Sequence, residues 1–189
     1  GSVEATISNF EILKTGAMGA ATSINLANLD DINAISSAGD GASTARVMTV
    51  TNAQEAFSLT LTATSHADME HNISFVDSSG TSDSMAITLS ANANLQSGDI
   101  IANAVETISI NSDDTLPVVL GGTLSTHTMT LTSDAVKTIT VTGDAKLTLI
   151  NTSTTLTSVD ASANTKGVTW ATIGVIAANA TITGSSGAD

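Results

Sequence analysis

The chain has 189 residues, of which 41% are hydrophobic and only 2% aromatic, and it carries a formal net charge of -13. A domain of this length buries ~70% of the surface that its unfolded chain exposes, so a core built from Ala, Val, Ile and Leu is possible. The negative charge repels phosphate groups, which makes nucleic acid and anionic membranes poor partners and cations good ones.

The residue types that the sequence lacks exclude further classes of protein. There is no Cys, which excludes disulfides and thiolate metal sites. No run of about 18 apolar residues occurs, so we expect no membrane insertion. The first two residues, Gly1 and Ser2, are typical of a cloning remnant, and we expect any targeting signal to lie outside this chain.

Aliphatic residues alternate with polar residues, mostly the 31 Thr and 24 Ser, along most of the chain, and this alternation predicts an all-β fold. In chain order, the strands expected are residues 47–51, 57–62, 73–76, 85–89, 108–110, 129–132, 139–142 and 147–150. Turns are expected at residues 39–41, 77–80, 97–99, 111–114 and 143–144, where Gly, Asp, Ser and Asn gather. The best candidate for a helix, residues 26–35, contains Asn and Asp, which are poor helix formers.

The two halves of the chain differ in how regularly the aliphatic strand motifs are spaced along the sequence. In the second half, a motif of three aliphatic residues begins at Val105 and again at Val136, with a degenerate copy from Leu156. Its strands recur about every 18 to 20 residues, as from Ile139 to Val159 and from Leu131 to Leu149. This period predicts a parallel β-solenoid over residues 105–189. The first half has no such repeat, and residues 1–104 are expected to form an antiparallel, β-sandwich-like region.

Several segments of the second half, taken in order, resemble a known family. They are residues 105–110, 128–131, 136–145, 147–149, 156–162 and 182–189, together with residues 7–13 near the start of the chain. This order is similar to the segment that precedes the RTX repeats in S-layer proteins of Gram-negative bacteria such as Caulobacter and Campylobacter fetus. The resemblance departs from the family at the end of the chain, where only Gly187-Ala-Asp189 represents the expected Gly-Gly-x-Gly-x-Asp array.

The resemblance implies a non-enzymatic, extracellular structural subunit. Members of this family are exported by type I secretion and assemble with Ca²⁺ into a lattice of identical copies on the cell surface. Their attachment to lipopolysaccharide uses a separate region, which would lie outside this chain. An RTX-type adhesin or biofilm-matrix segment is the alternative, and a solenoid polysaccharide lyase is less favoured because cationic and aromatic residues are few.

Calcium takes six to eight oxygen ligands, and Asp residues in turns supply such oxygens at close range. The expected calcium ligands are Asp40, Asp77, Asp83, Asp113, Asp114, Asp134, Asp144, Asp160 and Asp189. We expect three of these, Asp134, Asp144 and Asp160, to come into register at successive strand exits. The alternative for each Asp is that it only caps its own turn.

Three other features are weaker. His66 and His71 flank two acidic residues at a spacing that a transition metal can use, although a solvated loop is the better interpretation. His127 has no identifiable partner. Trp170 is expected either to anchor an interface or to cap the end of the solenoid core.

Overall fold

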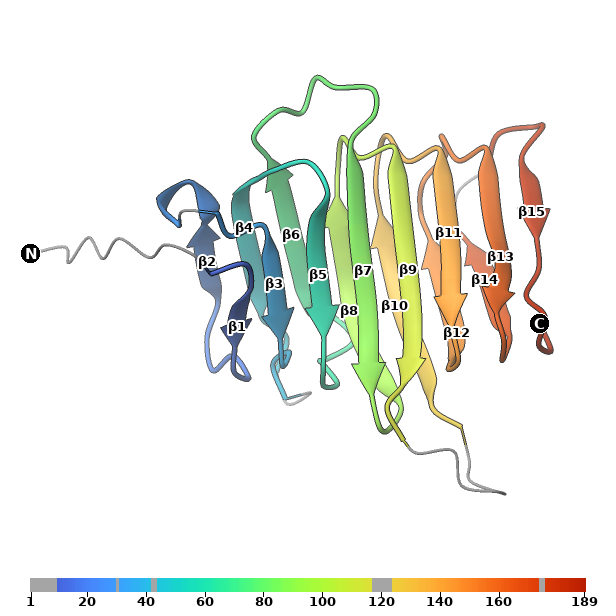
Figure 1. Cartoon of the computed structure of the whole chain (residues 1–189), viewed down its shortest axis with the longest axis horizontal. Helices are drawn as coiled ribbons and strands as arrows, with labels where there is room; N and C mark the ends of the chain where they lie inside the picture. Colours follow the sequence, from blue (N-terminus) through green and yellow to red (C-terminus); the bar gives the residue numbers. More distant parts are fainter. Residues whose placement is uncertain (1–9, 30, 42–43, 117–123, 174–175) are drawn as a thin grey trace, which may run out of the picture.

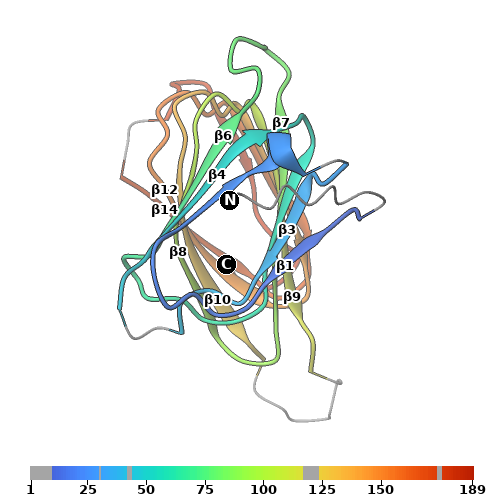
Figure 2. The same cartoon turned by 90° about the vertical axis from the view of Figure 1, so that its left-hand side faces the viewer.

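Two parallel β-sheets face each other along the whole length of the fold (Figures 1 and 2). The structure, a computed structural model, describes residues 10–29, 31–41, 44–116, 124–173 and 176–189. Successive strands alternate between the two sheets, and every strand pair within the described residues is parallel. Two consecutive strands therefore make one coil of a β-solenoid.

The strands are short, and within each sheet they follow one another in chain order along the stack. Sheet A contains β1 (Leu13–Thr15), β3 (Ala34–Ser37), β5 (Phe57–Leu61), β7 (Ser84–Ala91), β9 (Thr107–Asp114), β11 (Thr138–Gly143), β13 (Ser158–Asn164) and β15 (Thr181–Thr183). Sheet B contains β2 (Thr22–Asn25), β4 (Val47–Ala53), β6 (Glu70–Phe75), β8 (Leu95–Ala102), β10 (Thr126–Thr132), β12 (Lys146–Asn151) and β14 (Val168–Thr172).

The core lies between the sheets and is filled by one alternate set of side chains from each strand. Because side chains of a strand point to opposite faces in turn, the aliphatic residues of the Thr/aliphatic pattern all face inward. Parallel register then places Ile35, Leu59, Ile87 and Ile110 next to one another on four neighbouring strands, each at most 1% exposed. At roughly 2 kcal/mol per buried large aliphatic side chain, these stacked columns are the main source of stability.

The predicted solenoid of the second half is confirmed. Ile139 pairs in register with Val159 of the following coil, as expected, and with Ile108 of the preceding coil. Sheet B advances by a step of the same length, because His127 of β10 pairs with Leu147 of β12. The shorter step expected from Leu131 to Leu149 is wrong, since Leu149 pairs with Met129.

The antiparallel sandwich expected for the first half is wrong, because its strands are parallel and belong to the same two sheets. For example, β5 pairs in parallel with β7, where Ile87 is the partner of Leu59. Alternation in a sequence marks a strand but not the direction of its partner, and long connections obscure the repeat. Near residue 104 both sheets continue, as β7 pairs with β9 and β8 with β10.

Two predicted turns are also wrong, because they lie inside strands. Residues 97–99 belong to β8, where Gly98 has φ +77° at a shift of register against β10. This is a β-bulge, which lets a strand carry an extra residue without ending. Residues 111–114 form the last half of β9. The weak helix candidate contains only a short 3-10 helix, η1 (Leu26–Asn28).

Among the described residues, we find no helix with the length and apolar character needed to cross a membrane.

Candidate functional site

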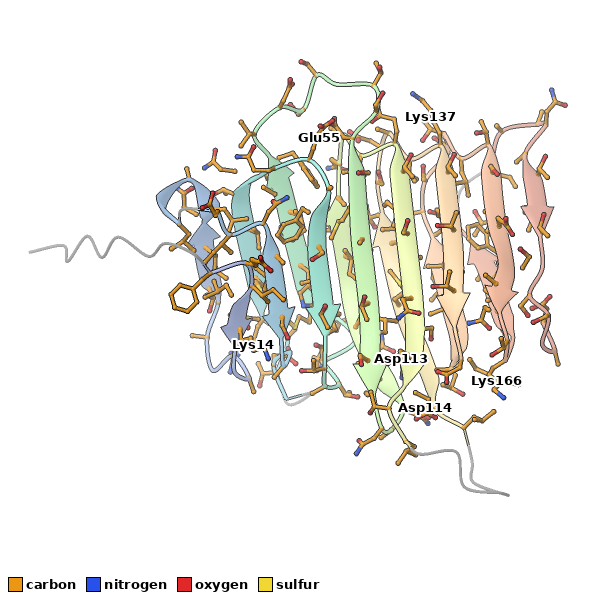
Figure 3. All side chains as sticks on the ribbon, in the orientation of Figure 1. Lys14, Glu55, Asp113, Asp114, Lys137 and Lys166 are labelled. Atoms are coloured by element: carbon orange, nitrogen blue, oxygen red, sulfur yellow. The ribbon has the colours of Figure 1, made fainter. Side chains whose placement is uncertain are left out.

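The acidic residues gather at the two corners of the solenoid, where the chain passes from one sheet to the other. We call the turns from sheet A to sheet B the lower corner and the turns from sheet B to sheet A the upper corner, as they lie in Figure 1. Figure 3 shows Asp113 and Asp114 at the lower end of β9 and Lys137 at the upper corner. Asp160 differs, because it lies on the exposed outer face of β13.

At the lower corner, Asp114 and Asp144 hold the connection between β9 and β10. The backbone N–H of Asp114 donates to Asp144 Oδ1 at 2.9 Å. The carboxylate of Asp114 accepts the backbone N–H groups of Ser125, at 2.8 Å, and Leu116, at 2.9 Å. These bonds favour the ionised form and lower the pKa of Asp114. Asp113 is bound separately, because its carboxylate accepts the hydroxyl of Ser90 at 3.2 Å.

At the upper corner, two buried carboxylates stack at the entrance to sheet A. Asp83 is 3% exposed and Glu106 is 8% exposed, and the backbone N–H of Asp83 donates to Glu106 Oε2 at 3.1 Å. Lys137 follows in the next coil, with Nζ 3.9 Å from Glu106 Oε1. Asp83 Oδ2 has no hydrogen-bond partner among the described residues. Asp134 lies at the same corner and accepts the backbone N–H of Ala104 at 2.8 Å.

Three other predicted ligands accept hydrogen bonds from a Ser that lies two or four residues away in the sequence. Asp77 accepts the N–H and hydroxyl of Ser79, and Asp160 accepts the N–H of Ser162. Asp189 accepts the hydroxyl of Ser185 and the backbone N–H of Val168. In each case the hydroxyl and N–H bonds to the carboxylate lower the pKa of the Asp.

The solenoid does not bring Asp134, Asp144 and Asp160 together, although we expected them in register. Asp134 follows β10 at the upper corner, Asp144 follows β11 at the lower corner, and Asp160 lies within β13. Within the described part of the chain, no group of three or more His, Asp or Glu side chains is placed so that it could hold a metal ion. Asp114, Asp134 and Asp144 instead accept backbone N–H groups at the corners.

The histidines are placed differently from the prediction. His71 lies in β6 and not in a loop, and its side chain is fully buried in the core. His66 is at the surface, where its Nδ1 lies 3.7 Å from Asp68 Oδ2. Its backbone N–H donates to the buried Asp40 at 2.7 Å. The inward alternation of His71 with Ile73 was the sequence signal that could have identified a core residue.

Two further groups have surroundings that the sequence analysis did not identify. His127 is fully buried, with Nδ1 3.2 Å from the hydroxyl of Ser112. On the outer face of sheet B, Glu70 of β6 is in register with Asp99 of β8. Burial raises the pKa of Asp99, and the nearby negative charge of Glu70 raises it further. The hydrogen bond from Thr132 has the opposite, lowering effect on this pKa but does not cancel the rise. No local pattern reveals this pair, because its members lie on strands of different coils.

Trp170 lies on β14, the last strand of sheet B among those described, and packs against the end of the core. It lines a mostly apolar cavity of about 340 Å³ together with Val159, Val168 and Ile182.

Comparison of the chain with protein-family models, with curated proteins and with solved structures finds no match.

Proposed function

We propose that this chain is a structural module of a bacterial surface layer, a secreted scaffold that associates with copies of itself. The observation that carries the proposal is the continuous stack of parallel strands from β1 to β15. In such a stack each coil contacts only its neighbours, so length and rigidity come from repetition and the surface is presented as a regular array. This geometry suits a part that holds shape and spacing in a larger assembly.

The resemblance to RTX-type S-layer proteins supports the same role. Its strongest segments coincide with the solenoid strands β9, β11 and β13, which stack in register. Type I export and attachment to lipopolysaccharide through another region belong to this proposal, because they are properties of the family that the segments resemble.

Calcium dependence is part of the proposal and rests on charge. A net charge of -13 opposes close packing of identical copies, and a divalent cation reduces that repulsion. The described residues offer pairs of acidic groups, such as Asp83 with Glu106 and Glu70 with Asp99, but no larger group. A calcium ion held by such a pair would need its remaining oxygens from water, carbonyl groups or a neighbouring copy.

Electron microscopy of the protein, with calcium and with a chelator, tests this function. We expect a periodic sheet with calcium, its loss on chelation, and a melting temperature that falls when calcium is removed. NaCl at equal ionic strength serves as the control. Monovalent ions also screen the negative charge in general, whereas they do not occupy a specific calcium site. Monomers under every condition and an unchanged melting temperature would contradict the proposal.

A second candidate, an adhesin that binds polysaccharide, is favoured by the outer face of sheet A. The central outward positions of four neighbouring strands carry only small uncharged groups, namely Ser58, Thr60, Ala86, Thr88, Ser109, Asn111, Thr140 and Thr142. Thr140 donates to Ser109 at 3.2 Å and Thr142 to Asn111 at 3.1 Å, so polar groups form rows across the strands. Retention on a polysaccharide matrix, with isolated particles in the microscope, would favour this candidate over the lattice.

A further inference from the structure

Three charged residues, Asp83, Glu106 and Lys137, occupy matching positions at the upper corner in three successive coils of sheet A. Each stands two residues before a buried residue of its strand, and these buried residues are in register with one another, namely Met85, Ile108 and Ile139. The three charged residues therefore follow one another along the stack. Figure 3 shows Lys137 at this corner.

Asp83 has a buried carboxylate oxygen that the described residues leave unsatisfied. The residue is 3% exposed, and its Oδ2 has no hydrogen-bond partner among them. Loss of hydration disfavours an ionised carboxylate, so buried charges are paired with opposite charges or coordinate metal ions. The ammonium group of Lys137 contacts the other acid, with Nζ 3.9 Å from Glu106 Oε1. Asp83 therefore needs a further cation.

Glu106 is held against Asp83 by hydrogen bonds between the two coils. Its Oε2 accepts the backbone N–H of Asp83 at 3.1 Å. In return, the backbone carbonyl of Asp83 accepts the N–H groups of Glu106, at 3.1 Å, and Thr107, at 3.0 Å. Two carboxylates against the one ammonium group of Lys137 leave this position with a net negative charge.

The connection from β6 to β7 covers the Asp83 carboxylate with groups rich in oxygen. Residues 77–82 are all exposed, contain three Ser and one Thr, and form the loop above β6 and β7 in Figure 1. Gly80 lies over the carboxylate, since a Cβ atom added to it would be 2.7 Å from Asp83 Oδ2. A surface loop moves more readily than a strand, so this cover can open and close around an ion.

We propose that Asp83 and Glu106 together bind one Ca²⁺ ion at the upper corner, beneath the loop of residues 77–82. Calcium accepts six to eight oxygens in irregular geometry, so loop carbonyls, hydroxyls and water complete its ligands. The ion joins two successive coils and holds the exposed loop against the stack. This inference rests on the calcium dependence proposed above and assigns that dependence to one corner of the fold.

Calorimetric titration with CaCl₂ tests the site. Asp83→Asn should weaken calcium affinity by about tenfold or more, because one of the two charged ligands is lost. Glu106→Gln should weaken it similarly, while its amide oxygen still accepts the N–H of Asp83. Asp160→Asn is the matched control with the same change of net charge, because Asp160 is exposed on the outer face of β13, and its affinity should be unchanged. Equal affinities of the Asp83→Asn and Asp160→Asn proteins would overturn the proposal.

Thermal unfolding separates ion binding from a purely structural role of Asp83. In a chelator, the Asp83→Asn protein should melt at or above the temperature of the unmodified protein, because the amide removes a buried charge that lacks a partner. With calcium it should melt below the unmodified protein, which gains stability from the bound ion. An equal loss of melting temperature with and without calcium would show that the carboxylate only supports the fold, and would overturn the site.

Lys137 provides a test of opposite sign. Its ammonium group repels an ion bound at Glu106, so Lys137→Met should raise calcium affinity by about threefold in a buffer of low ionic strength. Lys137→Arg keeps the positive charge and is the control, with an affinity close to that of the unmodified protein. Equal affinities of the two Lys137 variants would contradict an ion beside Glu106.

The site and the proposed structural role can fail separately. If the Asp83→Asn protein forms a calcium-dependent sheet as the unmodified protein does, the site is overturned and the structural role stands. If the unmodified protein binds Ca²⁺ through Asp83 but stays monomeric, the site stands and the structural role is overturned. If the unmodified protein neither binds Ca²⁺ nor assembles, both are overturned.

Discussion

His71 is an ionisable side chain in the middle of an aliphatic core. It is in register with Met48 of β4 and Ile100 of β8, and neither ring nitrogen has a hydrogen-bond partner among the described residues. Loss of hydration on burial lowers the pKa of His71 to about 4, and the charge of Asp40 offsets this only in part. The imidazole is therefore neutral in the folded protein at pH 7.

The free energy of unfolding should fall as the pH is lowered from 6.5 to 4. Over this range the unfolded chain binds the proton of His71 and the folded chain does not, and the full difference corresponds to about 3 kcal/mol. His71→Leu should remove this share of the pH dependence, as measured by urea denaturation at several pH values. The surface variant His66→Asn is the control, and identical pH profiles for the His71→Leu and unmodified proteins would contradict the assignment.

At the scale of the single strand, Gly143 shows how closely the coils approach. It ends β11 with φ +110°, and a Cβ atom at this position would clash with the carbonyl oxygen of Ser112 in the preceding coil. The neighbouring atoms belong to backbone that is itself paired, so they cannot move aside without breaking the ladder. Only glycine satisfies both the dihedral angle and the space here.

Gly143→Ala should therefore destabilise the protein by about 2 to 3 kcal/mol, from backbone strain together with the steric clash. Gly19→Ala is the matched control, because no atom lies within 4 Å of its added Cβ and its φ is not positive. Chemical denaturation of both variants measures the difference. If both variants lose the same free energy of unfolding, the expectation is contradicted, and the coils have room to separate at Gly143.

The elements were predictable where the local pattern decides the outcome. All eight strands expected from the Thr/aliphatic alternation overlap observed strands. β8 escaped because Ser97-Gly98-Asp99 has the composition of a turn, whereas the bulge at Gly98 keeps the strand paired. The parallel pairing of the first half was hidden because its coils differ in length. For the candidate ligands, the alternative to calcium binding was that each Asp hydrogen-bonds to nearby residues, and the contacts of Asp77 and Asp160 are of this local kind. The neighbours of Asp83 could not be predicted, because they depend on the register between distant segments.

For the whole molecule, the shared sheets predict one cooperative unfolding transition. β7 pairs with β9 and β8 with β10, so no gap in strand pairing separates residues before 104 from those after it. Core residues Leu59 and Ile139 lie on opposite sides of this position, and both are 0% exposed.

Leu59→Ala and Ile139→Ala should each lower the free energy of unfolding by about 2 to 5 kcal/mol and move the same single transition. Calorimetry with circular dichroism at two wavelengths tests this expectation. Two transitions, each moved by only one of the variants, would instead indicate that the chain contains two independent domains, divided as its sequence predicts.

The corners absorb large differences in coil length while the strands stay aligned. The stretch of chain from Ile110 to its partner Val141 is much longer than the stretch from Ile139 to its partner Val159. The additional residues belong to the connection between β9 and β10, and lengthening a connection costs little conformational entropy. Insertions at these bends can therefore accumulate in evolution, and foreign peptides can be grafted there for display. In both cases the register between neighbouring strands stays the same.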